Sequence, residues 1–373
     1  MANDTRAIKA TCLCTAAAHE ITLPASAFPF KAIFCHCSSD RHSTGSLCLG
    51  IAVLPPEYKA PGAWLEKLQS TEFSKRITHY FCPTCGTMML ARLGGGDGGA
   101  RWDVCTGALE QIDGVVEVDC HEYIADTVDG GFSDFLQRVD GKQVGRWSGE
   151  PGQGEQLPLY WQSSSRPTIQ PSPSDKLHAY CRCKGVEFWI SRPSKRSAMG
   201  KAAWPDVLHP FDSPAPKPKD AVWWLRAGGT KYLAGCCSCD SCRLATGQEW
   251  IEWAFVPAVD ITLDEAGQVP FSREFGMLKH YRSSEVATRH FCGGCGATVF
   301  WDGDERPQLL DIAVGLLDAP EGARAESWLE WRTARLSYRE DALPRAKGVT
   351  EGVEEGLRGY GKRYQREPQD AAL

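Results

Sequence analysis

Cysteine is the residue type whose spacing in this 373-residue chain indicates chemistry, because most of its 17 copies fall in ordered motifs. Two sets join a C-x-C pair to a distant C-x-x-C-Gly segment. They are Cys12, Cys14, Cys82 and Cys85, and Cys181, Cys183, Cys292 and Cys295. Four thiolates suit tetrahedral zinc, and the following glycine, Gly86 or Gly296, tolerates the positive φ of a tight turn beside it. We therefore predict one structural zinc in each set, linking strands that are far apart in sequence.

A further motif, Cys237-x-Cys239-x-x-Cys242, supplies three thiolates. Three protein ligands and an open fourth position are typical of a reactive zinc site. Such a site is anionic, which favours capture of a soft external thiol over hydrolysis. The alternative is that the neighbouring Cys236 closes a second structural cluster. We treat Cys237, Cys239 and Cys242 as candidate catalytic and metal-binding residues.

The cysteine motifs occur twice in the same order, which indicates a duplicated domain. The middle motif of the first copy reads Cys35, Cys37 and Asp40, so an oxygen ligand stands where the second copy has a third thiolate. A carboxylate binds zinc less well among sulfurs, and His36 or His42 could compensate for it. We therefore expect the chemistry in the second copy and a weakened or regulatory metal site in the first.

The order of these motifs resembles that of the glutathione-dependent formaldehyde-activating enzyme and centromere protein V family in both halves. The family's C-H-C-x-x-C-R segment followed by T-G is similar to residues 35–45 and 237–247, and its later G-x-L-D is similar to residues 315–318 and, more weakly, 107–110. The resemblance implies a β-tent fold, a structural zinc in each domain, and a second zinc beside which glutathione and formaldehyde meet. It implies a carbon–sulfur lyase that forms S-hydroxymethylglutathione or acts on a related thiol adduct.

Three polar residues flank the cysteine motifs of the second copy and are candidates for substrate binding and proton transfer. Arg243 would pair with a glutathione carboxylate, or would instead anchor a loop through backbone carbonyls. His290 or His280 would move the proton, or would simply pack beside a core strand. We place Arg243 with the three cysteines in the candidate catalytic set.

Domain boundaries follow from the repeat and from composition. We predict a first zinc domain at residues 1–147, a Gly-, Ser-, Gln- and Pro-rich linker at 148–175, and a second zinc domain at 176–345. The second domain carries an insertion at about 191–231, expected to be a surface excursion pinned by tryptophans. Residues 346–373 are a charged tail, expected to be frayed or only partly helical. Because the linker cannot build a core, we expect the halves to be separable there.

The elements that position these residues are predicted to be mostly short strands. Runs of β-branched and aromatic residues predict strands at 254–256, 297–301 and 309–317. Helix signals are few, at residues 63–68 and 132–138. The predicted fold class is all-β with minor helix, in two tandem zinc-binding domains that the resemblance identifies as β-tent domains.

Charge and hydropathy argue against two classes of partner. The chain has 41 basic and 47 acidic residues, a net charge of −6 and no long basic block, so no nucleic acid partner is expected. It has neither an apolar run of membrane-spanning length nor a signal peptide, so we expect a cytoplasmic protein whose thiols stay reduced. The expected partner is a small thiol such as glutathione. The alternative is a non-catalytic zinc scaffold or thiol sensor that binds a protein partner.

Overall fold

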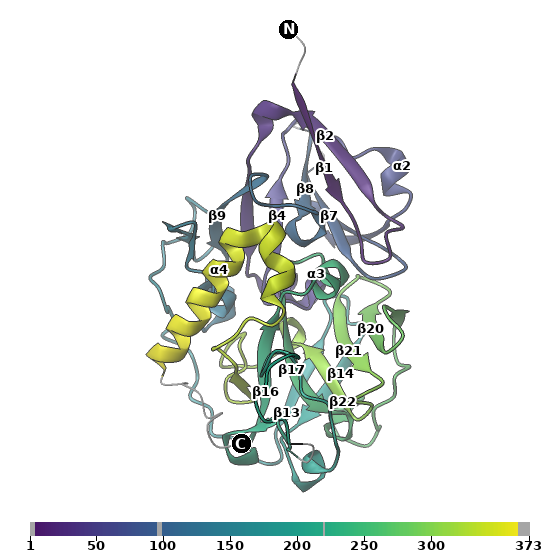
Figure 1. Ribbon diagram of the computed structural model, residues 1–373, viewed down its shortest axis with the longest axis vertical. Coiled ribbons are helices and arrows are strands. Elements are labelled where there is room, and N and C mark those ends of the chain that lie inside the picture. The colour runs from purple at the N-terminus through teal and green to yellow at the C-terminus, as the bar shows by residue number, and fades with distance from the viewer. Residues whose placement is uncertain (1–3, 95–98, 219–220, 365–373) are drawn as a thin grey trace.

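The computed structural model describes residues 4–94, 99–218 and 221–364, and it contains two β-rich halves that meet along a broad contact (Figure 1). Strands account for 34% and helices for 20% of the structure, so the predicted class, mostly β with minor helix, is confirmed. Within the described ranges, no helix combines the length and the apolar character that crossing a membrane would require.

The first half is built on an eight-stranded sheet in the order β12-β9-β3-β4-β8-β7-β6-β5. The first two strands of the chain form a separate antiparallel hairpin outside this sheet. Its elements are β1 (Thr5–Ala10), β2 (His19–Pro24), β3 (Phe30–Cys35), α1 (Ser38–Thr44), β4 (Leu49–Val53), α2 (Gly62–Leu65), β5 (Gln69–Ser74), β6 (Ile77–Phe81), β7 (Met88–Gly94), β8 (Ala100–Cys105), β9 (Val116–Glu122), β10 (Arg138–Val139), β11 (Lys142–Gln143) and β12 (Gly145–Arg146).

The second half repeats this arrangement in the order β15-β16-β17-β22-β21-β20-β19, with β23 beside β16. Its elements are β13 (Lys176–Tyr180), β14 (Glu187–Ser191), β15 (Leu225–Arg226), β16 (Lys231–Cys237), α3 (Asp240–Thr246), β17 (Ile251–Pro257), β18 (Ile261–Thr262), β19 (Leu278–Arg282), β20 (Ala287–Cys292), β21 (Thr298–Gly303), β22 (Leu309–Ala313), β23 (Leu329–Trp331) and α4 (Arg339–Arg363). Short 3-10 turns are η1 (Ala25–Ala27), η2 (Thr106–Ala108), η3 (Ile124–Thr127), η4 (Gly131–Asp134), η5 (Lys195–Ala198), η6 (Ala227–Gly229), η7 (Ala258–Asp260) and η8 (Val314–Leu316).

Local sequence explains these elements. The central strand β17 is an almost unbroken apolar run and is buried on both faces. The edge strand β5 is polar and alternates between exposed and half-buried residues, which protects a sheet edge. The predicted strand at 309–317 is too long, because β22 ends at Ala313 and η8 follows it. The predicted helix at 132–138 is only a 3-10 turn at Gly131–Asp134.

Helices α1 and α3 begin within the middle cysteine motif of each half and were not predicted. The sulfur of Cys37 accepts the N–H of Asp40 at the start of α1, and the sulfur of Cys239 accepts the N–H of Cys242 at the start of α3. Both helices end at a glycine in the left-handed conformation, Gly45 or Gly247. The Thr-Gly pair of each motif is therefore a helix end.

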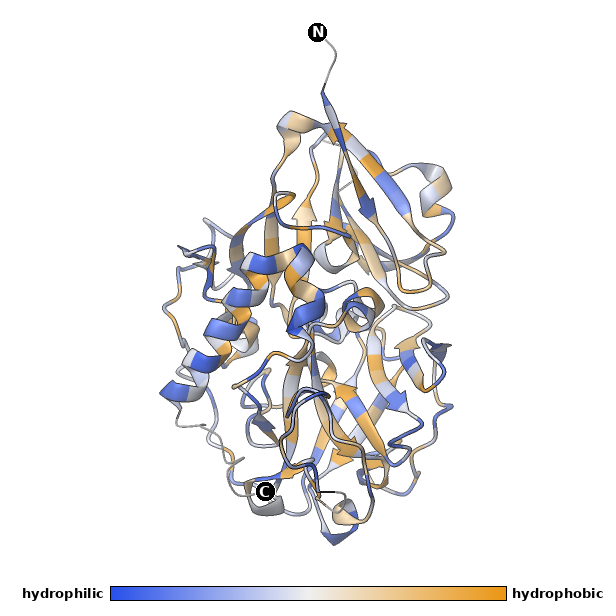
Figure 2. Cartoon of the chain, viewed as in Figure 1, coloured by the Kyte–Doolittle hydropathy of each residue, from blue (hydrophilic) through white to orange (hydrophobic). Residues whose placement is uncertain are grey.

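The tail prediction is wrong for residues up to 364, because α4 spans 25 residues, with a kink at Ala346, and packs on the first half (Figure 1). Val353, Leu357 and Tyr360 on α4 are fully buried. Glycines and charged residues between these positions obscure the helical period, and Figure 2 shows the resulting hydrophilic and hydrophobic bands along α4. Residues 365–373 of the predicted tail lie outside the described residues.

The same backbone hydrogen bond joins the two halves twice, once in each direction. Gly107 donates its N–H to the carbonyl of Gly247 at 3.0 Å, and Gly315 donates to the carbonyl of Gly45 at 2.8 Å. Buried Glu252 of the second half accepts the N–H of Leu47 from the first at 2.8 Å. Separating the halves would leave these buried groups unpaired. These contacts argue against the expectation that the halves separate at the linker.

Candidate functional site

The cysteines of each four-cysteine set converge, with all sulfur atoms of a set within 4.8 Å of one another. Cys14 Sγ lies 3.5 Å from Cys82 Sγ, and Cys183 Sγ lies 3.5 Å from Cys292 Sγ. Zinc–sulfur bonds of about 2.3 Å in a tetrahedron place sulfurs about 3.8 Å apart, so both sets fit a zinc ion. Each set lies within one half. A metal bound to it could join the turn after β1 to the end of β6 in the first half, and the turn after β13 to the end of β20 in the second.

The turns around these sulfurs explain the glycine of each C-x-x-C-Gly segment. Gly86 and Gly296 have φ of +82° and +80°. A Cβ on Gly86 would lie 2.5 Å from the ring of Phe291, and a Cβ on Gly296 would lie 2.6 Å from the ring of Phe81. The turn of each half therefore packs against the phenylalanine that precedes the turn of the other half.

The three thiols of the second half also converge, since Cys237, Cys239 and Cys242 have all their sulfurs within 4.8 Å of one another. Cys237 ends β16, whereas Cys242 lies in the first turn of α3. Cys236 belongs to no metal-ligating group among the described residues. It is fully buried, and burial raises the pKa of its thiol. The geometry therefore does not support Cys236 as a closing ligand.

Arg289 on β20 is the cation nearest to this centre, and its Nη1 lies 3.5 Å from Cys242 Sγ. Hydrogen bonds from Cys237 and Cys239, together with the charge of Arg289, lower the pKa of Cys242. Arg289 is buried, so little water screens this interaction. Arg289 was not predicted from the sequence; the available signal was its place two residues before Phe291 on the strand that leads to the C-x-x-C segment.

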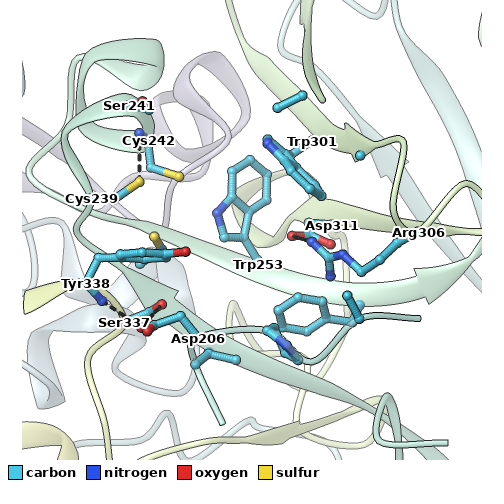
Figure 3. Close-up of a pocket in the computed structure, with 18 of the residues that line it drawn as sticks. Asp206, Cys239, Ser241, Cys242, Trp253, Trp301, Arg306, Asp311, Ser337 and Tyr338 are labelled. Carbon is cyan, nitrogen blue, oxygen red and sulfur yellow. Dashed lines mark hydrogen bonds and ion pairs between the residues drawn. The ribbon is translucent and has the colours of Figure 1, made fainter. Parts of the chain in front are cut away.

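A cavity of about 530 Å³ opens beside the three thiols (Figure 3). Its volume is in the range of small-molecule sites. Aromatic side chains form much of its wall, and Arg306 and Asp311 lie across Trp253 from the cysteines in Figure 3. The residues that carry its chemistry are Asp206, Cys237, Cys239, Cys242, Trp253, Arg289, Trp301, Arg306, Asp311 and Tyr338.

The insertion forms one wall of this cavity through residues 203–207 and Phe211. Trp223 and Trp224 are buried and donate their indole N–H groups to backbone carbonyls of the insertion at 3.2 and 2.9 Å. These bonds join parts of the insertion to each other, and Trp223 also packs edge-on against Phe255 of β17 with ring centroids 5.2 Å apart. Buried Asp206 of the insertion also holds the segment 335–338, accepting the N–H of Tyr338 at 2.9 Å.

Arg243 does not line the cavity. Its Nη1 donates to the carbonyls of Gly107 at 2.6 Å and Leu109 at 3.2 Å, and its other nitrogens bond Asp240. The guanidinium therefore bridges the two halves and is not presented to a ligand. This is the anchoring alternative, and the placement of Arg243 in the catalytic set is wrong.

Neither candidate histidine of the second half lines the cavity. His290 stacks on Phe300 with ring centroids 4.2 Å apart, and burial lowers its pKa to about 4. His280 pairs with His290 across neighbouring strands, with ring centroids 6.1 Å apart. Both therefore pack at the sheet, and the proton-transfer role proposed for them is not supported.

The first half brings Cys35, Cys37 and Asp40 together in the same way, with Cys37 Sγ 3.2 Å from an oxygen of Asp40. The two histidines expected to compensate are engaged elsewhere. His36 Nε2 lies 2.9 Å from His121 Nδ1, and His42 Nδ1 lies 2.7 Å from the carbonyl of Tyr180.

His79 faces this cluster instead. Its Nε2 lies 4.0 Å from Asp40 Oδ1, and its place on β6, two residues before Phe81, matches that of Arg289 on β20. Burial lowers the pKa of His79 to about 3 and raises that of Asp40. The first half thus pairs an acid with a neutral imidazole where the second half pairs a thiol with a guanidinium.

Comparison with known protein families gives one match. The model of a family described as glutathione-dependent formaldehyde-activating enzyme matches residues 7–126 and, a second time, residues 225–332. The two matches cover more than half of the chain and correspond to the two halves. No curated protein matches the chain.

Proposed function

The chain belongs to the glutathione-dependent formaldehyde-activating enzyme family, and from this premise we propose that its second half is a carbon–sulfur lyase centre. Its substrates would be a small thiol such as glutathione and formaldehyde, joined as S-hydroxymethylglutathione, or a related thiol adduct. The Cys237, Cys239 and Cys242 set would hold the metal of this centre. The four-cysteine sets would hold structural zinc, and the Cys35, Cys37 and Asp40 set a weaker fourth ion.

One observation carries the proposal. The three-cysteine set lines a 530 Å³ cavity, whereas the cysteines of the two four-cysteine sets do not contribute to that cavity. Three ligands leave a position for a substrate sulfur, while four ligands close a site. Zinc bound there would supply the positive charge that keeps a substrate thiol ionised.

The side chains of the chain itself would serve binding and orientation. Arg289 would offset the negative charge of the thiolates, because its guanidinium lies 3.5 Å from Cys242 Sγ. Trp253 and Trp301 would exclude water from the substrate and cover its carbon atoms. The ion pair of Arg306 and Asp311, with nitrogen and oxygen 3.0 Å apart, would bind polar groups of the substrate.

The experiment is to measure the exchange between formaldehyde, glutathione and their adduct by nuclear magnetic resonance with the zinc-loaded protein. We expect Cys242→Ser to lose at least about 100-fold of the catalysed rate. The control is Cys37→Ser, which removes a thiol from the cluster of the first half and should leave the rate within about twofold. Equal rates for Cys242→Ser and the unmodified protein would contradict the proposal.

The alternative is a thiol sensor or zinc scaffold that binds a protein partner. It is favoured by two apolar residues that line the cavity and face solvent, since Phe211 is 62% and Val286 46% exposed. Exposed apolar residues of this size can mark a protein contact. Thiol binding without any catalysed exchange would favour this alternative.

A further inference from the structure

We infer that Tyr338 is a further catalytic residue of the second half, whose hydroxyl donates the proton to the aldehyde oxygen when the carbon–sulfur bond forms. This inference rests on the proposed function. Tyr338 lies in the segment between β23 and α4 and lines the same cavity as Cys239 and Cys242. In Figure 3 its ring lies beside the two cysteines and its hydroxyl points into the cavity toward Trp253.

The first observation is the availability of this hydroxyl. The Tyr338 hydroxyl has no hydrogen-bond partner within the part of the chain that the structure describes, although its backbone groups are bonded. A phenol has an ordinary pKa of about 10, and burial raises the pKa of Tyr338, so the hydroxyl carries its proton at neutral pH. The hydroxyl is therefore a donor that faces the position of a substrate.

The second observation is the backbone of Tyr338, which has φ of +52°. A bulky residue in the left-handed region is uncommon and carries strain that the surrounding structure must hold. Asp206 holds it here, because one carboxylate oxygen accepts from both the Ser337 hydroxyl at 2.8 Å and the Tyr338 N–H at 2.9 Å. The insertion that supplies Asp206 therefore fixes the direction of the tyrosine.

The third observation is the repeat. The N–H of Ser238 bonds the carbonyl of Ser337, and in the first half the N–H of His36 bonds the carbonyl of Glu122. The residue after Glu122 is therefore the counterpart of Tyr338, and it is also a tyrosine, Tyr123, with φ of +55°. Tyr123 donates its hydroxyl to Glu150 at 3.1 Å instead. The hydroxyl of the strained tyrosine is therefore hydrogen-bonded in the first half, which has Asp40. In the second half, which has three thiols, it has no partner among the described residues.

The substrate thiolate attacks the aldehyde carbon, and the sulfur–carbon bond forms while the carbonyl π pair moves to oxygen. That oxygen takes the proton of Tyr338, which gives the hemithioacetal and a tyrosinate. Water returns a proton to the tyrosinate, and the thiol lost its own proton to water when it ionised. The net reaction is addition of the thiol to the aldehyde, and cleavage is the reverse.

The test compares Tyr338→Phe with Tyr123→Phe, which removes the same hydroxyl from the first half. We expect Tyr338→Phe to retain its zinc and its affinity for glutathione, and to lose about 100-fold or more of the catalysed exchange rate. Tyr123→Phe should keep the rate within about twofold. A rate for Tyr338→Phe within about threefold of the unmodified protein would overturn the inference.

A second measurement does not depend on turnover. Calorimetry should show that the unmodified protein binds preformed S-hydroxymethylglutathione about three- to tenfold more tightly than glutathione, because Tyr338 donates to its hydroxyl oxygen. Tyr338→Phe should lose this preference. Equal affinities in the unmodified protein would overturn the role of Tyr338 while the proposed thiol site stands. Failure of the unmodified protein to bind either ligand would instead overturn the proposed function and, with it, this inference.

Discussion

Arg289 lies against Cys242, with 3.5 Å between the guanidinium Nη1 and the thiol Sγ, and both residues are buried. The equivalent positions in the first half hold His79 and Asp40, whose Nε2 and Oδ1 atoms are 4.0 Å apart. A thiolate–guanidinium pair stays charged, whereas a neutral imidazole cannot offset a carboxylate. The two halves therefore share one fold, and their electrostatics differ at this pair.

The first prediction concerns this pair. Arg289→Met should raise the pKa of Cys242, because it removes a cation from a thiol whose pKa is lowered in the folded protein. Zinc at the three-cysteine set should then leave at a pH about one unit higher on acidification. Metal release followed with a chromogenic chelator would measure this shift. Arg289→Lys keeps the charge and should release zinc close to the unmodified curve; identical curves for Arg289→Met and the unmodified protein would refute the electrostatic role.

The second prediction separates structural from reactive metal. Cys292→Ser should cost several kcal/mol or prevent folding, because Cys292 joins distant strands and zinc binding there is part of the folding free energy. Cys242→Ser should stay folded and lose one zinc, since its motif is local. Thermal unfolding with metal analysis measures both. Equal destabilisation by the two changes would contradict the distinction.

The third prediction exchanges the pairs between the halves. Asp40→Cys combined with His79→Arg should strengthen zinc binding in the first half more than Asp40→Cys alone, because the added cation lowers the pKa of the new thiol. The reciprocal change, Cys242→Asp with Arg289→His, should weaken zinc binding in the second half. Competition with a chelator gives the affinities. No difference between the single and the double variant of the first half would refute the pairing.

The sequence alone was sufficient for the cysteine sets, the repeat and the β-rich class, because metal-ligand spacing and strand patterns are local signals. It was insufficient for Arg289, His79 and Tyr338, which lie far in sequence from the cluster residues they approach. Arg243 was misassigned because an arginine in a sequence can serve equally well to bind a ligand or to anchor a backbone carbonyl. Only the fold shows that its guanidinium bonds the carbonyl of Gly107 in the first half. Helix α4 was not predicted because its buried positions form a recognisable face only when the first half that covers them is known.

The fourth prediction follows from the shared contact between the halves. A protease site can be introduced between residues 170 and 174, where the chain is largely exposed. We expect cleavage there to leave the two halves associated. Arg345 bridges the halves by donating to the carbonyl of Leu109 at 2.9 Å and to Glu249, so the nicked fragments should stay together. Size-exclusion chromatography should show elution with the intact chain. Separate elution of the fragments would show that the contact is weak.

Calorimetry with two ligands tests directly whether Cys237, Cys239 and Cys242 hold a metal with an open thiol-binding position. The zinc-loaded protein should bind glutathione, while S-methylglutathione, which lacks an ionisable thiol, should bind at least about tenfold more weakly. Cys242→Ser should abolish glutathione binding, whereas Cys37→Ser should leave it unchanged. Equal binding of the two ligands by the unmodified protein, or unchanged glutathione binding by Cys242→Ser, would contradict the assignment.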